Sequence, residues 1–431
     1  MSTKIDLENI KKVHCVGIGG IGLSAVARLF HGRGAGVSGS DMNESPVTDG
    51  LREINIDVSI GHDTANLPAD ADLVVHTIAV PADNPELIAA KKGGIPVLTY
   101  PETLGLLSEN MYTVAVSGTH GKTTTTAMLA EILLAAGKDP TVIVGSLLHA
   151  QKSNFIGGQS NILVVEACEY RRSFLHLHPD ILVITNVDTD HLDYFDDLAD
   201  IQQAFTTLVA QLADDGVVVC DPQADNLAPV IAAAPNVIDF TGITLDGELE
   251  VPGEHNRQNG RAAIAAAEEL SVSHEEAVET VRKFAGTWRR AQKKGECNGA
   301  FVYDDYGHHP TEVRSTLEGF RQRFPDRRLV VAFQPHLYSR TKEFMDEFAD
   351  SLSLADVVIL LPIYAARELS DPAVSSDILA KMLADRDVSV QLAADFDQAT
   401  EKLTDLADDG TLILTQGAGD IYKVADNLIK S

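Results

Sequence analysis

The stretch YTVAVSGTHGKTTTTAMLAEILLAAG, residues 112–137, decides the fold of this chain. An apolar run from Val114 to Val116 stops at Gly118, and apolar residues return with helical spacing after Lys122. The pattern predicts a strand, a glycine turn and a helix. Gly118 and Gly121 allow the turn to curl, so that backbone N–H groups and the positive end of the helix dipole can surround a phosphate.

Two side chains of the same stretch suit a nucleoside triphosphate. Lys122 offers a positive charge to the outer phosphates, and the Thr123 hydroxyl is placed to bind Mg²⁺. The common P-loop has a glycine five residues before Gly121, whereas this chain has Val116 there. The shorter GTHGKTT form is typical of ATP-dependent amide ligases of the Mur and folylpolyglutamate types. We therefore predict ATP and Mg²⁺ as cofactors, with these loop residues at the nucleotide: Gly118, Thr119, His120, Gly121, Lys122, Thr123 and Thr124.

The composition is that of a soluble globular protein without a basic surface. The 431 residues, of which 45% are apolar and 23% charged, suggest two to four domains. The net charge of −29 argues against binding to nucleic acid or to an anionic membrane. The four cysteines are far apart, and no apolar stretch has the length of a signal sequence or a membrane span. We expect a cytoplasmic protein that is a monomer or a weak dimer.

A second glycine turn lies near the N-terminus. Val13–Val16 is predicted to be a strand and is followed by GIGGIG, in which Gly17, Gly19 and Gly22 form a GxGxxG motif before a helical pattern. The next strand ends at Asp41, where a dinucleotide-binding fold holds a ribose. The motif fits a UDP-sugar as well as NAD, because both carry a diphosphate. The candidate substrate-binding residues of this region are Gly17, Gly19, Gly20, Gly22, Ser40 and Asp41.

Polar residues follow two strands of the region 108–296. The buried pattern NILVVE ends at Glu166, and ILVITN is followed by Asp190 and His191. Ligands bind beyond the carboxyl ends of the strands in a doubly wound sheet, so both ends should face the phosphate turn. Glu166 and His191 are therefore candidate metal ligands together with Thr123, although Glu166 could also be a solvated strand end.

The rest of the chain contains a polar pair, a basic stretch and another α/β pattern. His255 and Asn259 are four residues apart at a helix start, where they could hold a base or ribose or cap the helix.

The basic stretch Thr287–Glu296 lacks a hydrophobic period and marks a hinge. Short apolar strands alternate with helices beyond it. The predicted fold class is α/β with three domains: a Rossmann-like N-terminal domain (1–107), a central P-loop ATPase domain (108–296) and a C-terminal Rossmann-like α/β domain (297–431).

The chain resembles the Mur ligase family over nearly its whole length. Within this family it most resembles the members that join L-alanine to UDP-N-acetylmuramate. It carries, in the family's order, the motifs GIGGIG with SGSD, GTHGKTTTT, SFLHLHP, TNVDTDH, HNRQN, WRR, DDYGHHPTE, QPHLYSRT, IYAARE and GAGDI. The resemblance implies a ligase of peptidoglycan precursor synthesis. In the implied reaction ATP phosphorylates the substrate carboxylate, and the amino group then displaces phosphate to form an amide.

The resemblance also implies roles for individual residues. The catalytic residues would be Lys122, Glu166, His191 and Arg340. Mg²⁺ would be held by Thr123, Glu166 and His191. The nucleotide would be contacted by His255, Asn259, Asp305 and Tyr306, with Arg289 and Arg290 in a nucleotide-linked arginine motif. The amino acid would face His336 and Arg340.

The chain departs from the family pattern at both the metal end and the amino-acid end of the site. Cys168 and Arg171 stand where the family usually has acidic residues. The sequence therefore leaves open whether the site binds one Mg²⁺ ion or two. Leu337 replaces an arginine and Arg367 replaces a glycine at the amino-acid end of the site. We predict that Arg340 and Arg367 together hold the carboxylate of the acceptor.

Three other functions remain open from the sequence. A muropeptide-recycling ligase would attach a whole peptide to UDP-N-acetylmuramate, and its pattern shares a tyrosine near Tyr170. An NAD-dependent oxidoreductase would explain GxGxxG and Asp41 but not the phosphate turn. A silent nucleotide sensor would be expected to lack Lys122, Glu166 or His191, and all three are present.

Overall fold

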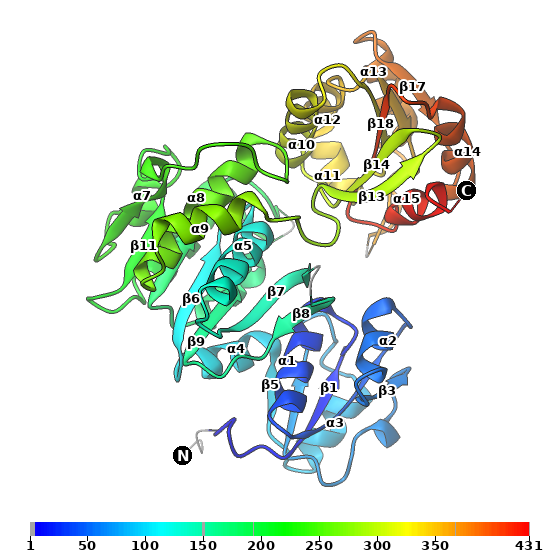
Figure 1. Cartoon of the computed structure of the whole chain (residues 1–431). Coiled ribbons are helices and arrows are strands. Elements are labelled where there is room, and N and C mark those ends of the chain that lie inside the picture. The colour runs from blue at the N-terminus through cyan, green and yellow to red at the C-terminus, as the bar shows by residue number, and fades with distance from the viewer. Residues whose placement is uncertain (1–4, 149–150, 193, 367, 431) are drawn as a thin grey trace. The chain divides into compact units, whose positions relative to one another are not determined.

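The computed structural model describes residues 5–148, 151–192, 194–366 and 368–430. The chain divides into two compact units, and its helices and strands are labelled in Figure 1. Unit 1 consists of Met1–Leu245 and Asn259–Val281, and unit 2 consists of Asp246–Gln258 and Arg282–Ser431. In the described part of the chain, no helix has the length and apolar character needed to cross a membrane.

The first sheet of unit 1 has five parallel strands in the order β3-β2-β1-β4-β5. Its strands are β1 (Lys12–Val16), β2 (Gly36–Asp41), β3 (Asp57–Ile60), β4 (Leu73–His76) and β5 (Val97–Thr99). Its helices are α1 (Ile21–Gly32), α2 (Pro46–Arg52), α3 (Pro85–Lys92) and α4 (Tyr100–Ser108), with a 3₁₀ turn at Thr64–Asn66. The strand order changes direction at β1, so the β1–β4 crevice is where such a sheet binds its ligand.

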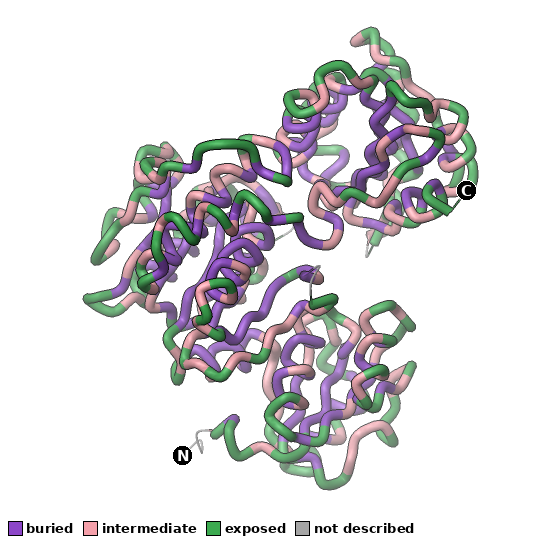
Figure 2. The backbone as a smooth tube through the Cα atoms, in the orientation of Figure 1, coloured by how far each residue is buried: buried purple, intermediate pink, exposed green. Residues whose placement is uncertain are grey.

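Helices cover both faces of this sheet. Cys15 on β1 belongs to the same core cluster as Leu23 and Phe30 of α1. The next residue, Val16, belongs to the cluster that contains Leu87 and Ala90 of α3. Successive strand residues point to opposite faces, so a strand that is covered on both sides is apolar throughout. The central strands β1 and β4 accordingly form the buried centre of the layer (Figure 2).

The second sheet of unit 1 has seven strands in the order β12-β11-β10-β6-β9-β7-β8, and only β8 is antiparallel to its neighbour. Its strands are β6 (Tyr112–Ser117), β7 (Thr141–Leu148), β8 (Ser153–Ile156), β9 (Ile162–Glu166), β10 (Ile181–Ile184), β11 (Val217–Cys220) and β12 (Val237–Asp239). The α-helices of this part of the chain are α5 (Lys122–Ala135), α6 (Leu198–Val209), α7 (Ala228–Ile231), α8 (Glu254–Glu269) and α9 (His274–Arg282). Short 3₁₀ segments lie at Tyr170–His176 and Phe240–Gly242. Because β6 lies between β9 and β10, the carboxyl ends of these three strands meet at one edge.

The sheet of unit 2 has six strands in the order β13-β14-β18-β15-β16-β17, and β13 is the antiparallel edge strand. Its strands are β13 (Gln292–Cys297), β14 (Ala300–Asp305), β15 (Arg328–Phe333), β16 (Val357–Leu360), β17 (Ser389–Leu392) and β18 (Thr411–Gln416). Its helices are α10 (Pro310–Arg323), α11 (Tyr338–Glu343), α12 (Met345–Leu352), α13 (Ser376–Ala384), α14 (Phe396–Leu406) and α15 (Tyr422–Leu428). On β15, Leu329 and Val331 face the cluster of α10, α12 and α13, whereas Val330 and Ala332 face the cluster of α14 and α15.

The predicted α/β fold class is confirmed, since the chain forms three mainly parallel sheets. One expectation differs from the structure. The basic stretch Thr287–Glu296 was predicted to be a hinge, but Gln292–Cys297 forms β13. Backbone pairing with β14 holds this strand, and the Lys293 ammonium lies 4.5 Å from the centre of the Phe301 ring. A strand held by its edge pairing and by cation–π contact does not need an apolar period.

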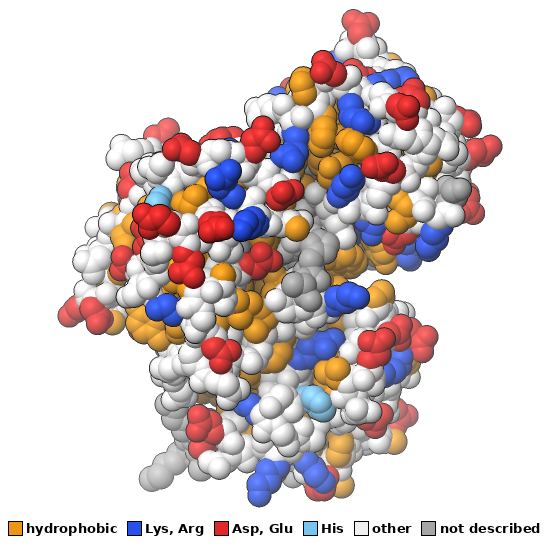
Figure 3. Space-filling view, in the orientation of Figure 1, with side chains coloured by type: hydrophobic (Ala, Val, Ile, Leu, Met, Phe, Trp, Pro, Cys, Tyr) orange, Lys and Arg blue, Asp and Glu red, His pale blue; other side chains and the backbone are white. Residues whose placement is uncertain are grey.

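Charged side chains of both signs are interspersed on the face of the molecule in Figure 3. The chain has 63 acidic and 34 basic residues. An anionic substrate therefore has to be attracted by particular groups of the site and not by the charge of the whole protein.

Candidate active site

A left-handed glycine turn joins β6 to α5. Gly118 has φ 129° and Gly121 has φ 86°, a region that glycine adopts without strain. Space is also limited, because a Cβ atom at Gly118 would lie 2.0 Å from Thr185 Oγ1, and one at Gly121 would lie 2.3 Å from Asn259 Oδ1. The turn therefore requires glycine at both positions. It also brings the side chain of Asn259, a predicted nucleotide contact, against the start of α5.

The turn is fixed from behind by the loop after β10. Asn186 accepts a hydrogen bond from the His120 N–H at 2.9 Å and donates one to the His120 carbonyl at 3.0 Å. The Thr119 hydroxyl accepts one from the Asp188 N–H at 2.8 Å. The backbone of the turn is thus held before any ligand binds, which is what preorganised anion binding requires. The sequence did not predict this role of Asn186.

Lys122 lies folded against its own turn. Its Nζ donates to the carbonyl oxygens of Gly118 at 2.6 Å and Thr119 at 3.0 Å, and it is 2.9 Å from Glu169 Oε2. The Lys122 side chain is 13% exposed and that of Glu169 only 3%. Burial lowers the pKa of Lys122, but the carboxylates of Glu169 and Glu166 raise it more, so its net pKa is above the ordinary value. Lys122 is therefore a permanently charged group poised beside the phosphate turn.

Glu169 is a site residue that the sequence did not predict. It is three residues beyond Glu166 and forms an ion pair with Lys122. His191 Nε2 lies 3.6 Å from the other carboxylate oxygen of Glu169. The sequence signal was the EACE pattern, in which Glu166 ends the strand and Glu169 comes three residues later. The structure thus places Glu169 between the predicted catalytic residues Lys122 and His191.

Thr123 and Glu166 form a pair of oxygen donors at the start of α5. The Thr123 hydroxyl donates to Glu166 Oε1 at 2.9 Å, and the Gly145 N–H of β7 donates to Oε2 at 2.6 Å. A hydroxyl and a carboxylate beside a phosphate turn are the hard oxygen ligands that Mg²⁺ prefers, with phosphate and water completing its shell. The two residues fit this ion. Within the described residues, no group of three or more His, Cys, Asp or Glu side chains could hold a metal.

His191, the third predicted metal ligand, belongs to an aromatic cluster. Its ring centre lies 4.9 Å from that of Tyr170, and Tyr170 in turn lies 6.0 Å from Tyr194. His191, Arg171 and Arg172 all have positive φ, between 52° and 55°. Backbone strain of this kind persists where surrounding contacts impose it, and it concentrates at functional sites. The Arg171 guanidinium carbon lies 5.7 Å from the centre of the Tyr170 ring.

The N-terminal glycine turn is closed by the end of β2. The Gly17 N–H donates to the Ser40 carbonyl at 2.8 Å, and the Gly19 N–H donates to Asp41 Oδ2 at 2.8 Å. A Cβ atom at Gly22 would lie 2.7 Å from the Tyr100 ring, so this glycine permits the close packing of α1 and α4. Gly20 is the residue before α1. The predicted residues therefore come together at the amino end of α1, where a diphosphate is favoured.

Ser40 supports the turn through its backbone. Its side chain is fully buried, and its hydroxyl donates to Glu86 Oε2 at 2.7 Å and lies 2.9 Å from His62 Nδ1. His14 Nε2 also lies 2.7 Å from the same carboxylate oxygen. Burial raises the pKa of Glu86, but the hydrogen bonds from His14 and Ser40 lower it more, and the net pKa is below its usual value. The Ser40 hydroxyl thus belongs to a buried network and not to the surface of the turn.

The predicted acceptor residues lie in unit 2, where β15 ends. His336 Nδ1 lies 3.2 Å from Arg340 Nη1, and the His336 ring stacks on Tyr364 with centres 5.7 Å apart. Arg340 is buried, with 8% of its surface exposed. Leu337 precedes α11 with φ 69° and ψ 137°, a strained conformation for leucine. Arg367 lies outside the described residues.

The predicted nucleotide residues of unit 2 form a group around the end of β14. Asp305 is buried and accepts hydrogen bonds from the N–H groups of Gly307 and Ala291, both at 2.8 Å. The Tyr306 N–H donates to the Arg289 carbonyl at 2.6 Å. Burial lowers the pKa of His255 more than the nearby Asp305 carboxylate raises it, so its pKa is below the ordinary value. His255 therefore favours the neutral form, which can both donate and accept a hydrogen bond.

Arg289 has a structural role that the arginine motif did not indicate. Its Nε donates to Asp304 Oδ2 at 2.8 Å, its Nη1 donates to the Gly419 carbonyl at 2.7 Å, and its Nη2 donates to the Gly417 carbonyl. Its side chain is only 3% exposed. The neighbouring Arg290 is 28% exposed and lies 3.8 Å from Glu312. Of the two arginines, Arg290 is the one available to a ligand.

Three domain models of a single protein family match successive parts of the sequence. The model described as Mur ligase family, catalytic domain, matches residues 12–112, and the Mur ligase middle domain matches residues 116–241. The Mur ligase, glutamate ligase domain, matches residues 289–419. This chain belongs to the Mur ligase family. The resemblance inferred from the ordered motifs is therefore confirmed.

Individual family members are similar over nearly the whole chain. The UDP-N-acetylmuramate–L-alanine ligase of Agathobacter rectalis is 39% identical over 99% of both chains, and that of Clostridium acetobutylicum is 38% identical over 98% of both. The crystal structure of UDP-N-acetylmuramate-alanine ligase MurC from Thermotoga maritima matches with a TM-score of 0.82 and 29% identity, over 97% of this chain and 98% of that one. A murein peptide ligase from Psychrobacter arcticus, at 24% identity and a TM-score of 0.68, shares the fold.

Proposed function

We propose that this Mur ligase joins L-alanine to UDP-N-acetylmuramate at the expense of ATP, in peptidoglycan precursor synthesis. The observation that carries the proposal is the 39% identity, over 99% of both chains, to an enzyme named for this reaction. The site geometry supports it, because a rigid phosphate turn with a buried lysine suits phosphoryl transfer. The predicted divisions assign the UDP-sugar to residues 1–107, ATP to residues 108–296 and the amino acid to residues 297–431.

The reaction divides into two steps. The carboxylate oxygen of UDP-N-acetylmuramate attacks the γ-phosphorus of ATP, which gives an acyl phosphate and ADP. The amino group of L-alanine then attacks the acyl carbon, the C–O bond to phosphate breaks, and an amide and inorganic phosphate result. Lys122 offsets the charge that develops on the transferring phosphoryl group, and the N–H groups of the turn orient it.

Thr123 and Glu166 would hold Mg²⁺, with His191 as the third proposed ligand. When bound, the ion would supply charge compensation for the phosphates. Glu169 holds Lys122 in place through their 2.9 Å ion pair. His255, Asn259, Asp305 and Tyr306 are proposed to contact the nucleotide. This use of ATP and a nucleotide sugar favours a cytoplasmic enzyme, and we expect it to be a monomer or a weak dimer.

Phosphate release from ATP tests the proposed acceptor. UDP-N-acetylmuramate is supplied with L-alanine, L-serine, glycine or an L-Ala-γ-D-Glu-diaminopimelate tripeptide, each in turn. We expect fast release with L-alanine and little with the tripeptide. Release with the tripeptide alone would identify a muropeptide-recycling ligase, and no release with any acceptor would indicate a nucleotide sensor.

The ligand of the N-terminal turn can be identified by calorimetry on the full-length protein. We expect saturable binding of UDP-N-acetylmuramate and none of NAD, because the family reaction uses the UDP-sugar and the Asp41 carboxylate already accepts the Gly19 N–H. Saturable NAD binding without a response to the UDP-sugar would instead support an oxidoreductase.

Replacement of Arg340 by alanine tests the proposed acceptor pocket. A buried guanidinium that binds a carboxylate contributes about 1.5 to 3 kcal/mol, so we expect the KM for L-alanine to rise about 10- to 100-fold. The KM values for ATP and UDP-sugar should change little. Lys342→Ala on the same helix is the control, because Lys342 is more than half exposed and pairs with Asp371. An unchanged KM for L-alanine in Arg340→Ala would reject the assignment.

The predicted partnership with Arg367 is tested in the same assay. Arg367→Gly restores the residue usual in the family and is expected to raise the KM for L-alanine if both guanidinium groups hold the carboxylate. An Arg367→Gly enzyme with an unchanged KM for L-alanine would leave Arg340 as the sole proposed partner.

A further inference from the structure

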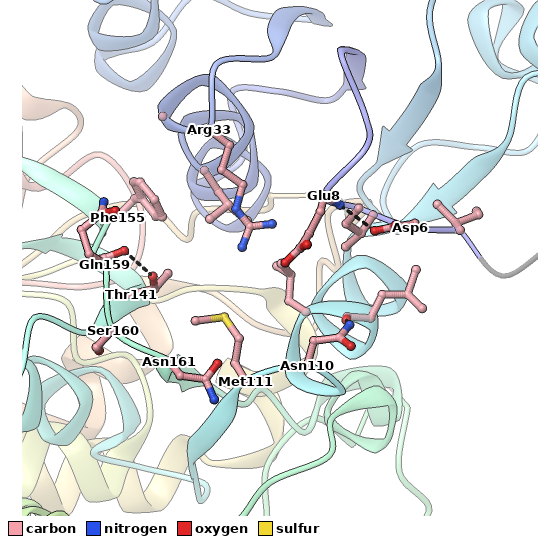
Figure 4. Close-up of a pocket in the computed structure, with 18 residues that line it drawn as sticks. Asp6, Glu8, Arg33, Asn110, Met111, Thr141, Phe155, Gln159, Ser160 and Asn161 are labelled. Carbon is pink, nitrogen blue, oxygen red and sulfur yellow. Dashed lines mark hydrogen bonds between the residues drawn. The ribbon is translucent and has the colours of Figure 1, made fainter.

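Unit 1 contains a cavity of about 780 Å³ that the proposed reaction does not use (Figure 4). Met111, just before β6, and Thr141, the first residue of β7, form part of its wall, so it lies at the amino ends of these strands. The phosphate turn follows the carboxyl end of β6. A six-residue strand spans about 20 Å, so the cavity and the phosphate turn lie at opposite ends of β6.

The wall of the cavity combines apolar side chains with two opposite charges. Leu29, Leu106 and Phe155 contribute apolar surface. Glu8 and Arg33 project into the cavity from different segments of the chain (Figure 4). Across the described residues, neither side chain forms an ion pair or a side-chain hydrogen bond with protein. Two unused opposite charges above apolar surface favour a ligand that carries both charges and an apolar body.

We propose that this cavity binds a short apolar peptide with free termini. Its carboxylate would pair with Arg33, its ammonium group with Glu8, and its side chains would contact the apolar wall. A free amino acid fits less well, because its volume is small for a cavity of about 780 Å³ and it offers only one side chain to the apolar wall. The volume lies in the usual range for small-ligand sites. This proposal is independent of the proposed ligase function.

The cavity is connected to the N-terminal glycine turn through β8. Phe155 lines the cavity, and the residue before it, Asn154, is buried and donates hydrogen bonds to the Ile21 carbonyl and to Ser24 Oγ. Ile21 is the first residue of α1, at the turn where the UDP-sugar is proposed to bind. A peptide that repositions Phe155 therefore also affects Asn154 and the start of α1. We expect peptide and UDP-sugar to change each other's affinity by the same factor.

Titration of the full-length protein with trileucine tests the site. L-alanine is kept in excess throughout, so that its own site stays filled. We expect saturable binding, and about two- to fivefold weaker binding of N-acetyl-trileucine and of trileucine amide, since each lacks one charge and pairs at exposed groups are weak. Gln159→Trp, which places a large ring at the exposed rim of the cavity, should abolish binding while ligase turnover persists.

Paired comparisons locate each end of the peptide. In Glu8→Gln, acetylation of the peptide should no longer weaken binding, whereas amidation should still do so. In Arg33→Ala the pattern should be reversed. The proposal is overturned if trileucine does not bind, if the blocked peptides bind equally well, or if Gln159→Trp binds trileucine normally. Equal trileucine affinity with and without saturating UDP-N-acetylmuramate would overturn the coupling to α1.

Discussion

Replacement of Lys122 by alanine is expected to lower turnover by about 10²-fold or more. The reason is that the Lys122 ammonium is held at the phosphate turn, 2.6 Å from the Gly118 carbonyl oxygen. Without it the charge on the transferring phosphoryl group is less well compensated. Steady-state phosphate release with saturating substrates measures the effect. Lys91→Ala, at an exposed position of α3, is the control and should have normal turnover.

The structure adds a control for folding that the sequence did not suggest. The Lys122 side chain is only 13% exposed, and its charge compensates the buried carboxylate of Glu169. In Lys122→Ala the buried negative charge of Glu169 loses its positive partner, and a buried charge without a partner lowers the stability of the whole protein. Lys122→Ala/Glu169→Gln removes the buried charge. We expect the double variant to unfold like the wild type and still to have low turnover; near-normal turnover would reject phosphoryl transfer at this turn.

The interior strands could be predicted from the sequence, because burial on both faces makes them apolar without interruption. Val114–Val116 is an example, and it lies in a central strand. The edge strand Gln292–Cys297 could not be predicted in this way. It has Lys293 and Lys294 in its centre. This segment is held as a strand by its pairing with Ala300–Asp305, and a local sequence pattern does not reveal such pairing.

The residues that contact ligands directly were easier to predict than those that position them. Lys122, Thr123 and Glu166 follow strand ends or glycines, and the structure brings them together. Asn186 and Glu169 act on the same turn through hydrogen bonds and an ion pair with residues far away in sequence. Their partners become apparent only when β6, β9 and β10 lie side by side.

Replacement of Arg289 by alanine is expected to lower the free energy of unfolding of unit 2 by about 3 to 5 kcal/mol. The guanidinium is buried, and its loss leaves the fully buried Asp304 carboxylate without its 2.8 Å partner. Denaturant unfolding followed through Trp288, the only tryptophan of the chain, measures the change. Arg290→Ala is the matched control and should lose less than about 1 kcal/mol, since Arg290 is partly exposed and its partner Glu312 lies 3.8 Å away.

The pH dependence of the Arg289→Ala variant identifies the cause of its instability. Burial raises the pKa of Asp304 above its ordinary value of 3.8, and Arg289 opposes this shift. Without Arg289 the folded-state pKa rises further, so folded protein takes up a proton more readily than unfolded protein as the pH falls. The stability difference from wild type should therefore shrink as the pH falls through the folded-state pKa of Asp304. Arg289→Met/Asp304→Asn, which has no charge at either of these two positions, should be more stable than Arg289→Ala at neutral pH and lack this pH dependence. A difference from wild type that is constant with pH would show that lost packing, and not the Asp304 charge, destabilises the variant.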